Sequence, residues 1–124
     1  MYTVSVTKSF DAAHHLVGYR GNCANVHGHR WDVRVTIEGE ELNELGMLID
    51  FKIVKEQLSK FISRFDHHDL NTISPFDTTN PTAENLVILV WRELLVSSLG
   101  VMDVRLERLR LWETDTAWVE LRRE

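Results

Sequence analysis

The stretch HGHRWDVRVTIE, residues 27–38, alternates between side chains suited to a protein core and side chains suited to water. Its odd-numbered members are two histidines, a tryptophan and three aliphatic residues, whereas its even-numbered members are glycine, threonine or charged. Successive side chains of a β-strand point to opposite faces of the sheet, so this period of two predicts a strand with one buried face. His27 and His29 belong to that face.

A second alternating stretch lies upstream, at residues 2–12, and its pattern is broken only by Lys8. Its apolar members are Tyr2, Val4, Val6 and Phe10. If the strand continues regularly, His14 extends this apolar face. Antiparallel pairing of the two strands would then bring His14 beside the other two histidines at one end of the sheet. A single β-bulge would shift this parity.

Three imidazoles on one face form a candidate metal site. Catalytic zinc sites typically have three protein ligands and leave the fourth position for water or substrate, whereas structural sites are closed by four ligands and are rich in cysteine. We therefore predict that His14, His27 and His29 bind Zn²⁺ and leave one position open. Two alternatives remain: Cys23, the only cysteine, could close a structural site, or the six histidines of the chain could be scattered by chance.

Length and composition predict an ordinary globular domain. The chain has 124 residues, enough for one domain with its own core, which we expect to span residues 1–124. Hydrophobic residues make up 44% and charged residues 27%, and the net charge of −5 predicts no general affinity for nucleic acid or an anionic membrane. A single cysteine, no apolar run of roughly 20 residues and no signal-peptide pattern at the N-terminus favour a cytoplasmic protein.

Two helices are predicted in the middle of the chain. Asp50 is a suitable N-cap, and apolar residues recur at helical spacing over residues 51–65. Thr82 caps a second helix that we expect to reach about Leu99, with Gly100 as the residue after its end. This second helix is apolar almost all round, so the sheet, the first helix or another subunit would have to cover several of its sides.

Two further strands are expected at about residues 102–113 and 117–123, joined by a turn at 114–116. The apolar parity of the third strand changes between Leu106 and Leu109, which predicts a bulge or a strand covered on both faces. The order β-β-α-α-β-β defines an α+β domain with an antiparallel sheet. Strands at both ends of the chain leave sheet edges that need covering, so we expect homo-oligomerisation through them.

Several short motifs occur together over nearly the whole chain. They are FDAAH at 10–14, GYRGNC at 18–23, HGH at 27–29, IDF at 49–51, DH at 66–67, NPTAEN at 80–85 and ET at 113–114. Each motif is weak alone, but in this order they closely resemble the 6-pyruvoyl-tetrahydropterin synthase and 6-carboxy-tetrahydropterin synthase family. The resemblance implies the tunnelling fold (T-fold), whose β-β-α-α-β-β units oligomerise into a β-barrel as trimers and stack into a hexamer.

The resemblance also implies a zinc enzyme with a pterin substrate. Three residues separate Cys23 from His27, a spacing similar to that of the bacterial carboxy branch and shorter than that of animal pyruvoyl enzymes. That branch converts 7,8-dihydroneopterin triphosphate to 6-carboxy-5,6,7,8-tetrahydropterin, acetaldehyde and triphosphate, on the route to 7-deazapurines such as queuosine. The alternatives are a pyruvoyl-type or side-chain-releasing enzyme on the same pterin, or a zinc- or pterin-binding module without activity.

Carried over by motif, the resemblance assigns the zinc ligands and the general base. His14, His27 and His29 would bind zinc, which stabilises negative charge on hydroxyl and keto oxygens of the substrate. Cys23 would be the general base, because a thiol beside a metal ionises more readily than a free thiol. A role as fourth zinc ligand remains the alternative for Cys23.

The other implied site residues are a carboxylate–imidazole pair, a glutamate and a threonine. Asp66 would orient His67 for proton transfer, although an Asp-His at a helix end is otherwise most often a cap or surface pair, and His68 leaves open which histidine moves the proton. Glu113, as a catalytic and substrate-binding residue, would accept two hydrogen bonds from the pterin's amino group and ring N–H. A surface glutamate at a hairpin end is the alternative. Thr82 is a candidate ring contact, although helix capping already explains it.

Overall fold

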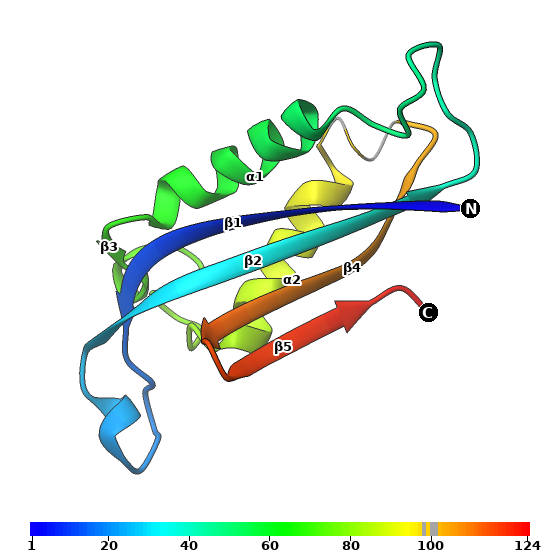
Figure 1. Cartoon of the computed structure of the whole chain (residues 1–124). Helices are drawn as coiled ribbons and strands as arrows, with labels where there is room; N and C mark the ends of the chain where they lie inside the picture. The colour runs from blue at the N-terminus through cyan, green and yellow to red at the C-terminus, as the bar shows by residue number, and fades with distance from the viewer. Residues whose placement is uncertain (98, 100–101) are drawn as a thin grey trace.

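The computed structural model describes residues 1–97, 99 and 102–124 (Figure 1). Its strands and α-helices follow one another as β1 (Tyr2–His14), β2 (His27–Gly39), α1 (Phe51–Phe65), β3 (His68–Asp69), α2 (Ala83–Leu95), β4 (Arg105–Thr114) and β5 (Ala117–Arg122). Two short 3₁₀ turns, η1 (Asn22–Ala24) and η2 (Leu70–Thr72), interrupt the loops. The predicted α+β order is confirmed, with the two-residue strand β3 as an addition.

The strands form one sheet in the order β3-β1-β2-β4-β5. Neighbouring strands are antiparallel except β3, which runs parallel to β1. Inward-facing residues of the strands and the buried residues of α1 and α2 form a single apolar cluster, with both helices packed against the sheet (Figure 1). None of the helices in the described part of the chain is long and apolar enough to span a membrane.

The hairpin of β1 and β2 sets the position of the histidines. Its ladder runs without interruption from Tyr2 opposite Gly39 to His14 opposite His27, so the predicted antiparallel pairing is confirmed. The apolar parity holds along both strands: Phe10 and Trp31 lie opposite each other and are buried in the core. Lys8, the exception to the pattern, reaches α1 and donates to the Ser59 hydroxyl at 2.7 Å.

Both helices begin where their caps predict. The Asp50 carboxylate accepts the Lys52 N–H, and the Thr82 hydroxyl accepts the Asn85 N–H, which satisfies an otherwise unpaired donor in each first turn. Helix α2 ends at Leu95, earlier than the predicted end near Leu99, because Ser97 tightens the chain with bonds from its N–H and hydroxyl to the Leu94 carbonyl. The predicted C-terminal residue Gly100 lies outside the described residues.

The all-round apolar surface of α2 is only partly covered within the chain. Leu86, Val87, Val90 and Leu94 are buried, but Ile88 and Leu95 are exposed. Val96, directly after the helix, is 86% exposed. Cover by another subunit therefore stays a prediction for this side of the helix.

Strand β4 starts at Arg105, slightly later than predicted, and carries two bulges. Thr36 pairs with Arg108 and Ile37 with Leu106, so Glu107 is left over and the predicted bulge is confirmed. On the other edge Trp112 pairs with Trp118 and Thr114 with Ala117, which leaves Glu113 unpaired. This second bulge was not predicted. Bulges re-aim side chains and end regular pairing, and this one lies at the end of the sheet that carries the histidines.

Candidate metal centre

The ends of three strands meet at one point of the sheet. His14 is the last residue of β1, His27 is the first residue of β2, and His29 follows two positions later on the same face. The ring centroids of these histidines lie 4.5, 4.8 and 5.3 Å apart. Glu113 of β4 joins them, and candidate ligand atoms of all four side chains lie within 4.8 Å of one another. The strand parity predicted the three histidines together; it did not predict Glu113 among them.

Backbone carbonyls fix the tautomers of two of these rings. His14 Nδ1 lies 2.8 Å from the Pro81 carbonyl oxygen, and His27 Nδ1 lies 2.7 Å from the Asn25 carbonyl oxygen. A carbonyl oxygen can only accept, so each Nδ1 donates and each Nε2 is left with its lone pair. Metal-binding histidines are commonly oriented in this way by a partner on the second ring nitrogen.

The remaining ring nitrogens are buried and point into the centre. His14 Nε2 and His27 Nε2 are buried and have no hydrogen-bond partner among the described residues. Burial lowers the pKa of His14 and of His29 below the ordinary value, although the nearby Glu113 carboxylate opposes this shift. These shifts favour the neutral form of His14 and His29, which is the form that binds a metal.

The spacing of the donor atoms fits a tetrahedral metal ion. Glu113 Oε1 lies 3.1 Å from His14 Nε2 and 3.3 Å from His29 Nε2. Ligand atoms about 2.1 Å from a tetrahedral zinc lie roughly 3.4 Å from one another. Imidazole nitrogens with a carboxylate oxygen form a common zinc donor set. The residues of the centre therefore fit a divalent metal such as zinc.

A buried tryptophan packs against two of the histidines of the centre. Trp31 is fully buried, and its ring meets the rings of His14 and His29 edge-on at centroid distances of 5.0 and 5.5 Å. Its indole N–H donates to the Ala12 carbonyl at 3.3 Å. This arrangement packs two of the imidazoles against a rigid apolar wall, which limits their rotation.

The Asp66–His67 pair lies on the turn after α1 and forms a separate group. Asp66 Oδ1 accepts the Asp11 N–H at 2.9 Å and lies 3.0 Å from His67 Nδ1. The Asp11 N–H is the main cause that lowers the pKa of the Asp66 carboxyl. His67 adopts a left-handed φ of 61° and its N–H bonds the Asp11 carbonyl at 2.6 Å, while its side chain stays 77% exposed.

His67, rather than His68, contacts the Asp66 carboxylate. His68 Nδ1 lies 2.7 Å from the Asp66 backbone carbonyl oxygen instead. An open hollow of about 540 Å³ is lined by His67 and also by His29 of the metal centre. The two groups therefore border a shared space, although their candidate ligand atoms form distinct clusters.

Cys23 lies in η1, within the loop that connects β1 and β2. Its side chain is half-buried, and its carbonyl accepts the Leu16 N–H at 2.8 Å. Among the described residues, the Cys23 thiol belongs to neither group of candidate ligand atoms. The structure thus gives no support to Cys23 as the fourth ligand. The side chain that adjoins the three histidines is instead the Glu113 carboxylate.

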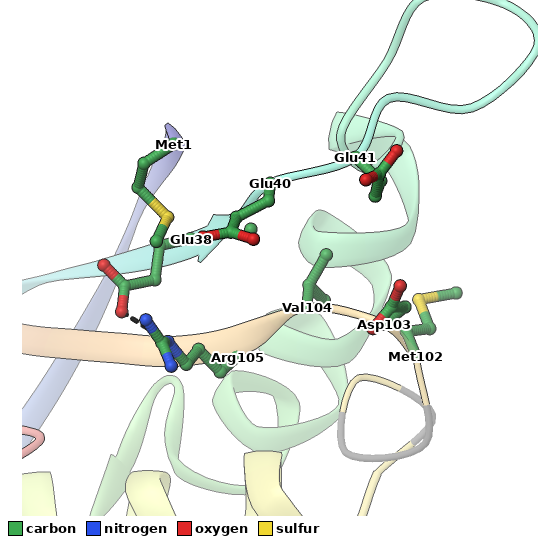
Figure 2. Close-up of a pocket in the computed structure, with 9 residues that line it drawn as sticks. Met1, Glu38, Glu40, Glu41, Met102, Asp103, Val104 and Arg105 are labelled. Atoms are coloured by element: carbon green, nitrogen blue, oxygen red, sulfur yellow. Dashed lines mark hydrogen bonds and ion pairs between the residues drawn. The ribbon is translucent and has the colours of Figure 1, made fainter.

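A second large hollow lies at the opposite end of the sheet, where β1 begins and β2 ends. It measures about 490 Å³, and its lining residues include the acidic Glu38, Glu40, Glu41 and Asp103 (Figure 2). Arg105 in this hollow pairs with Glu38. Within the described residues, no candidate metal-ligand group includes these side chains, so the chemistry that the sequence predicts lies at the histidine end.

Sequence reasoning missed two parts of the site. The carbonyls of Asn25 and Pro81 orient the histidines, but a backbone carbonyl has no signature in the residue type. The approach of Glu113 to the histidines depends on pairing between distant strands, which a single sequence does not reveal. The parity of Glu113 with the buried Leu109 and Leu111 was the only available signal.

The fold and the centre define a class: an α+β domain of T-fold topology with a three-histidine candidate metal site at the end of its first hairpin. The family model described as 6-pyruvoyl tetrahydropterin synthase matches residues 3–124, so the chain belongs to that family. The resemblance noted in the sequence is therefore confirmed.

Individual relatives and solved structures carry three different names. A protein of Archaeoglobus fulgidus named putative 6-carboxy-5,6,7,8-tetrahydropterin synthase is 34% identical over 97% of this chain and 95% of its own. A dihydroneopterin monophosphate aldolase of Pyrococcus furiosus is also 34% identical, over 91% of this chain and 90% of its own. The structure of 6-pyruvoyl tetrahydropterin synthase from Caenorhabditis elegans matches with a TM-score of 0.84 at 27% identity, over 99% of this chain and 96% of that one.

Proposed function

We propose that this protein is a zinc-dependent 6-carboxy-5,6,7,8-tetrahydropterin synthase. It would convert 7,8-dihydroneopterin triphosphate to 6-carboxy-tetrahydropterin, acetaldehyde and triphosphate, as a cytoplasmic step towards queuosine and other 7-deazapurines. The observation that carries the proposal is the cluster of three imidazoles, two of which have buried Nε2 atoms without a hydrogen-bond partner among the described residues. The Archaeoglobus relative supports the carboxy branch, and the single domain would comprise residues 1–124.

Zinc bound by His14, His27 and His29 would supply a Lewis acid that stabilises negative charge on oxygens of the substrate side chain. The chain itself holds these ligands ready, since carbonyls orient two rings and Trp31 supports two. Little reorganisation is then needed when metal and substrate bind, which favours catalysis by preorganised electrostatics.

Proton transfer falls to His67 and Cys23 in this proposal. Asp66 holds His67 Nδ1, which leaves the opposite ring nitrogen of this exposed imidazole free for the substrate. Cys23 is the candidate general base at the side-chain carbons. Glu113 would accept hydrogen bonds from the amino group and ring N–H of the pterin, and the Thr82 hydroxyl is a candidate ring contact.

The positions of these residues support a site that is shared between copies of the chain. Within one chain Cys23 and the Asp66–His67 pair both lie outside the histidine cluster. The sheet ends at β3 on one side and β5 on the other, and α2 keeps exposed apolar residues. Homo-oligomers, as trimers or as hexamers of two trimers, would cover these edges and bring the groups of neighbouring copies together.

A second candidate function is aldol cleavage of the pterin side chain. The Pyrococcus aldolase and the Archaeoglobus relative are both 34% identical to this chain, over 91% and 97% of it. The same metal centre and proton-transfer pair would suit this reaction, because it also develops negative charge on a substrate oxygen. A pyruvoyl-type lyase on the triphosphate is the third outcome within the family.

One experiment separates these functions. Zinc-loaded protein is incubated with 7,8-dihydroneopterin triphosphate or with the monophosphate, and products are identified by mass spectrometry together with an acetaldehyde assay. We expect carboxy product and acetaldehyde from the triphosphate. A pyruvoyl product, or a shortened side chain from the monophosphate, would move the protein to another branch. Bound pterin without turnover of either substrate would leave a binding module.

A further inference from the structure

The contact between Glu113 and the histidines does not have the geometry of a simple ion pair. Glu113 Oε1 lies 3.1 Å from His14 Nε2, yet within the described part of the chain this nitrogen has no partner with hydrogen-bond geometry. His14 donates through Nδ1 to the Pro81 carbonyl oxygen at 2.8 Å, so it is Nε2 that faces the carboxylate. A carboxylate oxygen therefore lies close to two imidazole nitrogens, and a metal cation bound by all three atoms would account for this grouping.

We propose that Glu113 is the fourth metal ligand while the substrate is absent, and that it leaves the metal when a pterin ring binds. The second half rests on the proposed function, in which this carboxylate binds the ring. The first half rests only on the geometry of this chain. In a centre closed in this way, the fourth coordination position would become available to the substrate side chain only after the pterin ring has bound the Glu113 carboxylate.

The four side chains differ in how firmly the chain holds them. His14 is 1% exposed and His27 is fixed by a carbonyl, whereas Glu113 is 32% exposed. Among the described residues, the ion-pair contacts of the Glu113 carboxylate are limited to the imidazole nitrogens of His14 and His29. A ligand that is held by the metal alone is the one that can exchange.

The backbone around Glu113 is consistent with such movement. Glu113 is the extra residue of the second β4 bulge, between the pairs formed by Trp112 and Thr114 with β5. The pairing of β4 with β2 ends at Trp112. Glu113 is therefore outside both ladders, and its side chain can change direction without breaking a ladder hydrogen bond.

Cobalt substitution tests the first half directly. Visible absorption of Co²⁺ in the metal-loaded protein reports the number and type of its ligands, and competition with a chelator gives the affinity. We expect Glu113→Gln to change the spectrum and to weaken Co²⁺ binding by at least about tenfold. Loss of a residue that only hydrogen-bonds to a metal ligand already costs about 10- to 100-fold in affinity, so loss of a ligand should cost at least the lower figure. An unchanged spectrum and affinity would overturn the four-ligand centre.

Glu107→Gln is the matched control, because Glu107 is the extra residue of the other bulge in the same strand and pairs with Arg108 away from the histidines. It should leave the cobalt spectrum and affinity unchanged. Circular dichroism shows whether each variant is folded. A folded Glu113→Asp variant, whose side chain is shorter by one methylene, should also lose the wild-type spectrum, since its oxygen no longer reaches the position of Oε1.

Addition of pterin, which has no side-chain hydroxyls, tests the second half. Saturation is followed by pterin fluorescence, and we expect the wild-type cobalt spectrum to change while that of Glu113→Gln stays constant. A wild-type spectrum that is unchanged at saturation would show that Glu113 remains on the metal, and would overturn its release. Failure to bind pterin would overturn both the release and the proposed function, but the four-ligand centre would still be decided by the first test.

Discussion

The histidine centre lies at the end of the β1–β2 hairpin against a buried tryptophan, whereas the Asp66–His67 pair lies on the turn after α1 with its imidazole exposed to solvent. The centre is built by long-range sheet register and backbone carbonyls. The pair is built by two adjacent residues held to Asp11 of β1. The first group is assembled within one chain, while the second presents its imidazole to solvent.

The largest expected effect is the loss of bound zinc when a histidine of the centre, but not one beside the Asp66–His67 pair, is replaced. His27→Ala removes a ligand whose orientation the Asn25 carbonyl sets, so we expect zinc affinity to fall by more than the roughly 100-fold that loss of an outer partner can cost. Turnover should become undetectable. His68→Ala, at an exposed histidine whose ring bonds a backbone carbonyl, should retain full zinc content by mass spectrometry. Equal zinc content in both variants would place the metal elsewhere.

Loss of either proton-transfer group should lower turnover while zinc stays bound. General acid–base groups typically contribute about 10²- to 10⁴-fold to rate, and we expect losses in this range for Cys23→Ala and for Asp66→Asn. Zinc content and the rate constant kcat are measured on the same preparations. Loss of zinc with the thiol would make Cys23 a ligand and would refute its role as base.

Mixing these two variants sharpens the comparison further. If one site takes its thiol from one copy and its Asp66–His67 pair from a neighbour, random hetero-oligomers contain roughly one quarter intact sites. We therefore expect co-expressed Cys23→Ala and Asp66→Asn chains, purified through two different tags, to recover activity that neither variant has alone. A mixed oligomer without recovery would mean that both groups act within a single chain.

Acid should affect the two regions in different pH ranges. Burial lowers the pKa of His14 from 6.5, so in metal-free protein the unfolded chain binds this proton first and stability falls as the pH drops below 6.5. The pKa of Asp66 is lowered from 3.8, chiefly by the Asp11 N–H, so its contribution is present above 3.8 and is lost only at lower pH.

Urea unfolding of chelator-treated protein between about pH 7.5 and about pH 5 measures the first effect. We expect the midpoint to fall over this range, and to fall less in His29→Gln, which removes a second histidine whose pKa burial lowers. Asp66→Asn should show the wild-type slope in the same range. A midpoint independent of pH in the wild type would contradict the burial of neutral imidazoles in the metal-free fold.

Features set by residues close together in the chain, or by a regular strand pattern, could be predicted from the sequence. Local chemistry predicted the start of each helix, since Asp50 and Thr82 act on N–H groups two or three residues away. Strand parity predicted the hairpin and the three histidines, because a period of two survives wherever one face is buried. The end of α2 was predicted too late, because its apolar pattern continues past Leu95 while Ser97 already closes the last turn.

Features that depend on pairing between distant strands could not be predicted from the sequence. The bulge at Glu107 was predicted from a change of parity, but the bulge at Glu113 leaves no such trace because the chain turns directly after it. Only the fold shows that Glu113 adjoins His14, and only the fold separates the Asp66–His67 pair from that cluster. The residue types of the site were thus readable, whereas their grouping required the tertiary structure.

The smallest expected effect concerns Thr82, which borders the centre without joining it. Its hydroxyl accepts the Asn85 N–H at 3.1 Å, so Thr82→Ala should lower the free energy of unfolding by about 1 kcal/mol. If the hydroxyl also contacts the ring, KM should rise by about 2- to 10-fold, as for one lost hydrogen bond. Zinc content should not change, because His14 is held by the neighbouring Pro81 carbonyl.

Thr82→Asn separates the two roles of this hydroxyl, because asparagine caps helices as well as threonine does but places an amide where the hydroxyl was. We expect urea unfolding to show restored stability while steady-state kinetics still show the raised KM. If the asparagine variant recovers both stability and KM, Thr82 acts only as a helix cap. The ring would then be oriented from the Glu113 side alone, and the turn before α2 would serve the centre solely through the Pro81 carbonyl.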